Sequence, residues 1–228
     1  MYSNRAAKLR FFFHILCIGA NKIADLILIA AKSRYVGMKR KRCKPVEAIP
    51  EIEGYVVEKK TISMLKANIV ALLAMALLAL LGLMAMYAIW GAFPFGRPWT
   101  GAAFFPAVVL GIVVHELIHG FTWMWVTRSG FRHLRFGTLS GGVYCHIDVP
   151  MNKRKYVIGA LMPLLLLGVL PFLLSFVMPS LWMMLFGVLF ISAAMGDVMI
   201  VWVIRHEPAD TLVYDHPTEA GCMVYHKQ

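Results

Sequence analysis

The chain has 228 residues, of which 60% are hydrophobic and 15% are charged, and its mean hydropathy is +0.69. This composition excludes an ordinary soluble domain and indicates an integral membrane protein. The net charge of +11 does not indicate nucleic-acid binding, because the basic residues lie beside apolar runs rather than in an aromatic-rich patch. Four cysteines without a C-x-x-C pair predict neither a zinc knuckle nor a disulfide framework.

Residues 1–37 form an N-terminal extension in our interpretation. Their apolar stretch makes a poor spanning helix, because it carries four polar side chains: His14, Asn21, Lys22 and Asp25. Two interpretations stay open at this point. The extension is either an additional membrane-associated segment or a non-native addition in front of a natural start at Met38. Residues 38–66 then form a basic cytoplasmic segment.

Four later runs are long enough for spanning helices, which need about 20 mostly apolar residues. They cover residues 67–90, 102–126, 156–178 and 181–204. Pro163 and Pro171 fall inside the third run, where each removes a backbone hydrogen bond and bends or opens the helix. The sequence therefore predicts an all-α polytopic membrane protein. Its four-transmembrane-helix bundle has a short cytoplasmic loop or hairpin between helices 2 and 3.

The distribution of lysine and arginine predicts the orientation of the bundle. Ten lie between Lys32 and Lys66, and six lie between Arg128 and Lys155, whereas the two opposite connections contain only Arg97. Cytoplasmic flanks carry the excess of basic residues. We therefore expect a multi-pass protein of the bacterial inner membrane, with residues 67–204 as the membrane domain and residues 205–228 as a cytoplasmic tail.

The second run contains the sequence VVHELIHGF, in which His115 and His119 lie four residues apart. On a helix this spacing puts both imidazoles on one face, with Glu116 beside them. H-E-x-x-H is the pattern in which two histidines bind Zn²⁺ and the glutamate acts as general base. Ionisable groups are costly inside a span and usually mark a functional site. The alternative is a buried polar group that is hydrogen-bonded within the bundle.

A catalytic zinc normally has three protein ligands, so one more must come from another element. At a rise of about 1.5 Å per residue, His119 and His115 lie roughly 13 and 20 Å from the basic flank at Arg128. Asp197 lies roughly 12 Å from Arg205, at a similar depth. It is also the only acidic residue in the third and fourth runs. We therefore expect His115, His119 and Asp197 to hold the metal. The alternative is a carboxylate paired within the bundle.

Other histidines and carboxylates lie outside the four runs. His146 and Asp148 could bind the metal only if their loop folds back into the membrane, and we favour a hairpin role for His146 instead. His206 and Glu207 follow the fourth run and suggest an interfacial cap. His133 is interpreted as a solvated loop residue.

Three stretches together resemble a bacterial family of small membrane proteins described as zincin peptidases, a domain of unknown function. They are HELIHG at 115–120, GD at 196–197 and VYDHPTEAGC at 213–222, so that the resemblance covers roughly residues 38–222. That family is in turn similar to the site-2 protease clan. The resemblance implies Zn²⁺ held by His115, His119 and Asp197, with Glu116 as the catalytic residue.

The sequence departs from the clan in two respects. Asp197 is followed by Val198, whereas the clan's aspartate commonly sits in a D-G pair. The outer connections are also too short to hold a substrate-selecting domain. We expect a zinc metalloprotease that hydrolyses peptide bonds of membrane proteins or peptides within or beside the bilayer, without nucleic acid as a partner. The alternative is a metal-binding carrier, sensor or inactive protease-like scaffold.

Overall fold

The computed structural model describes residues 49–96, 98–139, 142–216 and 219–228. The N-terminal extension expected at residues 1–37 lies outside the described residues. Within the described residues, four helices are long and apolar enough to cross a membrane. This confirms the predicted polytopic membrane protein with a bundle of four spanning helices, although the chain is mostly helical rather than all-α because it also contains strands.

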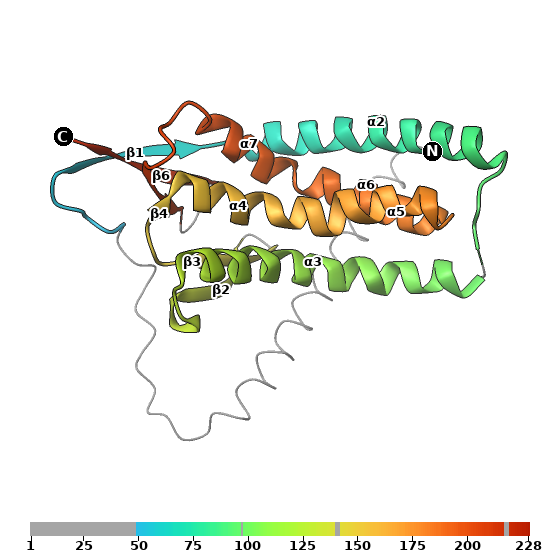
Figure 1. The fold of residues 1–228 in the computed structure, drawn as a ribbon, viewed down its shortest axis with the longest axis horizontal. Helices are drawn as coiled ribbons and strands as arrows, with labels where there is room; N and C mark the ends of the chain where they lie inside the picture. Colours follow the sequence, from blue (N-terminus) through green and yellow to red (C-terminus); the bar gives the residue numbers. More distant parts are fainter. Residues whose placement is uncertain (1–48, 97, 140–141, 217–218) are drawn as a thin grey trace, which may run out of the picture.

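The four spans lie side by side along the long axis of the molecule (Figure 1). The first is α2, Met64–Trp90, and the second is α3, Pro98–Thr127. The third consists of α4, Lys153–Pro163, the π-helical turn η2, Leu164–Val169, and α5, Leu170–Val177. The fourth consists of α6, Leu181–Ala193, and α7, Met195–Val203. The π-helical turn falls between the two prolines, which remove the backbone donors of a regular helix there.

Glycines bring the third and fourth spans into close contact. A Cβ atom on Gly187 would lie 2.6 Å from the backbone nitrogen of Phe172, and one on Gly168 would lie 2.9 Å from that of Ile191. Small residues are what allow helix backbones to approach each other in a membrane. The fourth span is thereby held against the third, and α7 begins at a fixed place in the bundle.

A four-stranded antiparallel sheet, which we did not predict, lies at the end of the bundle where α3 ends and α4 begins (Figure 1). Its order is β1-β6-β5-β4, and its strands are β1, Tyr55–Thr61, β6, Gly221–Lys227, β5, Leu212–Asp215, and β4, Met151–Asn152. Tyr55 pairs with Lys227 and Thr61 with Gly221. The segment expected as a cytoplasmic tail therefore includes two central strands.

A separate two-stranded hairpin follows α3. The short helix η1, Phe131–His133, leads into β2, Leu134–Leu139, which pairs with β3, Gly142–Ile147. The hairpin packs beside the last turns of α3, because Gly120 leaves room for it. A Cβ atom on Gly120 would lie 2.4 Å from Cys145 Sγ.

One buried cluster joins the helices to the strands at this end. It contains Trp123 of α3, Tyr156 of α4, Ile147 of β3 and Val213 and Val224 of the sheet. All five side chains are buried. Burial of apolar surface stabilises such contacts by about 25 cal/mol per Å². The cluster therefore fixes hairpin, sheet and helix ends relative to one another.

Candidate metal centre

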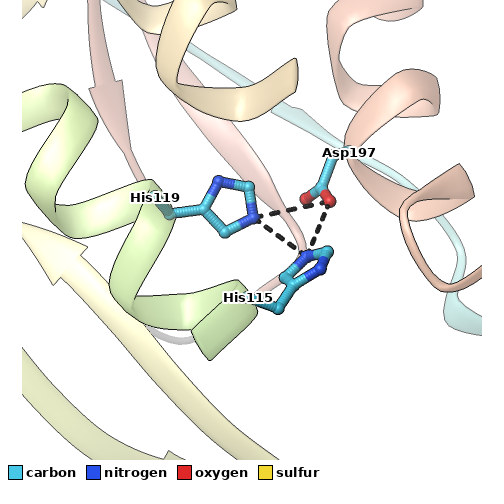
Figure 2. Close-up of side chains that lie close together, drawn as sticks. All are labelled: His115, His119 and Asp197. Carbon is cyan, nitrogen blue, oxygen red and sulfur yellow. Dashed lines mark hydrogen bonds and ion pairs between the residues drawn. The ribbon is translucent and has the colours of Figure 1, made fainter. Parts of the chain in front are cut away.

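Two histidines of α3 and one aspartate of α7 point at a common place (Figure 2). His115 and His119 lie one helical turn apart, with ring centroids separated by 4.9 Å. Asp197 lies in the first turn of α7, directly after the break between α6 and α7 at Ala194. The three side chains predicted as metal ligands are thus brought together from two separate spans.

The donor atoms of these side chains form a nearly equilateral triangle. The distance is 3.2 Å between the Nε2 atoms of His115 and His119, and Asp197 Oδ2 lies 3.4 and 3.5 Å from them. Ligand atoms around a tetrahedral zinc, at bond lengths of about 2.0–2.2 Å, are separated by about 3.3–3.6 Å. The set of two imidazoles and one carboxylate also suits Zn²⁺. The residues present therefore fit a zinc ion.

A hydrogen bond at Nδ1 fixes the orientation of the His119 ring. Its Nδ1–H donates to the carbonyl oxygen of Gly159, at 2.9 Å, so that in the neutral ring Nε2 carries a lone pair toward Asp197. Gly159 allows this approach, because a Cβ atom there would lie 2.1 Å from the indole of Trp123. The Trp123 ring in turn stacks on His119 at 5.3 Å. By contrast, His115 Nδ1 is buried with no hydrogen-bond partner among the described residues.

Glu116 is held by the hairpin rather than by another side chain. The backbone N–H of Cys145 in β3 donates to Glu116 Oε2 at 3.0 Å. The side chain of Cys145 is not a competing nucleophile, because burial raises the pKa of its thiol to about 12. The carboxylate beside the two histidines therefore has one oxygen fixed by a backbone donor.

The rival ligands lie elsewhere. His146 uses both ring nitrogens, with Nδ1 3.1 Å from Asp215 Oδ2 and Nε2 3.2 Å from the hydroxyl of Tyr214. Asp148 is bound by His133 and Arg135, at 2.8 and 2.6 Å. Neither His146 nor Asp148 belongs to the three-atom group, and His133 is half-buried and paired rather than fully solvated.

Sequence reasoning missed the groups that support the site. Gly159 offers a carbonyl and Cys145 a backbone amide, and neither contribution depends on a characteristic side chain. A usable signal was the glycine in an otherwise apolar span, since such a residue often marks close helix contact. The amide of Cys145 could not be assigned before the hairpin was placed.

Comparison with protein families gives a match. Residues 108–212 match the model of a family described as "Putative zincin peptidase". The matched segment contains the H-E-x-x-H motif and Asp197 and covers somewhat less than half of the chain. No curated protein and no solved structure matches the chain.

Proposed function

We propose that this protein is a zinc-dependent metalloprotease of the membrane, which hydrolyses peptide bonds in membrane-spanning or membrane-adjacent segments. The observation that carries the proposal is the convergence of His115, His119 and Asp197. Their donor atoms come from two spans and lie within 4.8 Å of one another. The similarity of residues 108–212 to a zincin peptidase family supports the same chemistry.

In this proposal His115 Nε2, His119 Nε2 and Asp197 Oδ2 would hold a zinc ion. A zinc ion bound there would polarise a peptide carbonyl and lower the pKa of water to about 7. Glu116 Oε1 takes up a proton from the attacking water and passes it to the leaving amine. The Cys145 amide keeps Glu116 beside the two histidines through these transfers, and Gly159 keeps the His119 ring in the tautomer that leaves Nε2 unprotonated.

The position of the site suggests the class of substrate. The two histidines are buried, and the Asp197 side chain is 24% exposed. A folded soluble protein could not bring a peptide bond to this depth. A substrate segment would have to lie in or beside the bilayer and be locally unwound, because a helical backbone keeps its carbonyls hydrogen-bonded. The excess of basic residues at the end of the bundle that carries the site favours an orientation with this end in the cytoplasm of a bacterial inner membrane.

The proposal is tested by measuring zinc and cleavage in the same preparations. We expect wild-type protein purified without chelator to contain about one zinc per chain and to cleave a membrane-tethered reporter. Glu116→Gln should keep the zinc but lower cleavage by about 10²–10⁴-fold, because it cannot accept the proton. The matched control is Glu53→Gln, at an exposed glutamate before β1, which should cleave like wild type.

Two results would contradict the proposal. If wild-type protein contains less than about 0.1 zinc per chain, the three side chains do not form a zinc site. If zinc-loaded Glu116→Gln cleaves as fast as wild type, the proteolytic role is ruled out. That result would favour a non-proteolytic metal-binding membrane protein, such as a carrier, sensor or inactive scaffold.

A further inference from the structure

A second buried polar group lies beside the metal centre, between the hairpin and the sheet. At its middle is Asp215, the last residue of β5. Its Oδ2 accepts a hydrogen bond from His146 Nδ1 and its Oδ1 accepts one from the hydroxyl of Tyr156, each at 3.1 Å. Tyr214 lies 3.2 Å from the other nitrogen of His146. The His146 side chain is 7% exposed and that of Asp215 is 17% exposed, so these bonds are shielded from water.

One end of this group reaches Glu116 through the backbone of β3. His146 follows Cys145, whose N–H holds Glu116 Oε2 at 3.0 Å. Fixing the His146 side chain fixes the strand next to that amide. The same strand lies in close contact with α3 at Gly120. The Cys145 amide is therefore positioned from two sides. One is the contact of β3 with α3 at Gly120, and the other is the hydrogen bond between His146 and Asp215.

The other end of the group reaches His119 through two aromatic rings. Tyr156 and Trp123 are stacked, with ring centroids 5.5 Å apart, and Trp123 is stacked on His119. The indole N–H of Trp123 also donates to the backbone carbonyl of Tyr156 at 3.0 Å. Asp215 thus contacts both the strand that holds Glu116 and the tyrosine behind a metal-binding histidine.

We propose that Asp215 is a positioning residue, which holds His146 and thereby keeps the Cys145 amide on Glu116. This inference rests on the proposed function for the role of Glu116. Asp215 lies beyond the matched segment, which ends at residue 212, and it belongs to the sheet rather than to the helix bundle. In this proposal the C-terminal strands help to position the residues of the site and are more than a tail.

The test compares two substitutions of His146 in the full-length, zinc-loaded protein. His146→Leu removes the donor to Asp215, whereas His146→Asn keeps a side-chain N–H close to the position of Nδ1. We expect His146→Leu to speed hydrogen exchange at the Cys145 amide and to lower kcat, each by about tenfold or more, with zinc content and KM unchanged. His146→Asn should recover most of both losses.

The matched control is His133→Leu. His133 also bonds an aspartate, Asp148, at 2.8 Å and also lies near the hairpin, but in the described part of the chain it forms no hydrogen bond or ion pair with Cys145 or Asp215. We expect it to leave Cys145 exchange and kcat unchanged. Equal effects of His133→Leu and His146→Leu would mean general loosening and would overturn the proposal.

The remaining outcomes also decide it. Wild-type exchange at Cys145 in His146→Leu would overturn the proposal. If that variant does not fold, Asp215→Asn replaces one acceptor oxygen by a donor and serves instead: faster Cys145 exchange supports the proposal, and wild-type exchange overturns it. If the wild type cleaves no substrate while Cys145 exchange responds as expected, the positioning role stands and the proposed protease activity fails.

Discussion

Two groups of side chains in the described part of the chain place three potential metal ligands within 4.8 Å of one another, and they differ in charge and surroundings. The first is His115, His119 and Asp197, and the second is Glu58, Glu207 and His226. The first lies in the bundle, with its side chains 6–24% exposed. The second lies at the sheet, where the Glu58 and His226 side chains are 54% and 41% exposed.

The second group already contains a cation. Lys60 forms an ion pair with Glu207 and lies 3.3 Å from Glu58 Oε2. The ion pairs of the first group involve only its own members among the described residues, and His119 is tied to a carbonyl oxygen instead. Ligand types at short range therefore do not by themselves distinguish the two groups. What separates the two groups is whether a lysine balances the carboxylates and whether further contacts orient the ligands.

The largest expected effect follows from removing one histidine of each group. We expect His119→Ala to lose nearly all of the bound zinc, because two remaining ligands do not hold the ion against a chelator. His226→Ala should keep the wild-type amount. The measurement is zinc content by elemental analysis after identical dialysis. Zinc loss in His226→Ala but not in His119→Ala would reverse the assignment of the two groups.

The second effect concerns the contact that orients His119. Gly159→Ala should weaken zinc binding by about 10–100-fold, because the added methyl group collides with Trp123 and moves the Gly159 carbonyl away from Nδ1. Gly130→Ala is the matched control, since a Cβ atom there meets only Arg132, at 4.0 Å. The measurement is competition for zinc with a chelator of known affinity. Equal affinities in the two variants would show that the orientation of His119 does not matter.

The helices and the convergence of His115, His119 and Asp197 could be predicted because their signals are local. The H-E-x-x-H spacing puts His115 and His119 on one helix face, and depth from the basic flanks placed Asp197 at their level. The four spans follow from apolar runs of sufficient length. Each inference needed only the periodicity of a helix and its rise per residue.

The sheet and the second group could not be predicted because they depend on pairing across the whole chain. β1 pairs with β6 from Tyr55↔Lys227 to Thr61↔Gly221, and the four spans lie between the two strands in sequence. No periodicity indicates which distant strand will be the partner. The surroundings of Asp215 were missed for the same reason, since its partners His146 and Tyr156 come from β3 and α4.

The smallest expected effect tests the role of Lys60 in the second group. Lys60→Met should lower the free energy of unfolding by about 1–3 kcal/mol, because it leaves the mostly buried Glu207 carboxylate without its partner. The measurement is the unfolding free energy in detergent, with Lys66→Met, at an exposed lysine in the first turn of α2, as control. No difference between the two variants would show that the pair contributes nothing to stability.

The pH dependence of the same pair gives an independent check. The hydrogen bond to Glu207, followed by the one to Glu58, raises the pKa of Lys60 above its ordinary value of 10.5. The folded state therefore binds this proton more tightly than the unfolded state. The contribution of Lys60 is fully present below pH 10.5 and is lost as the pH rises through the higher folded pKa. The difference in stability between wild type and Lys60→Met should accordingly be constant from pH 7 to 9 and shrink only in strong alkali. If the difference in stability between the two proteins already falls between pH 7 and 9, a group other than Lys60 is responsible for it.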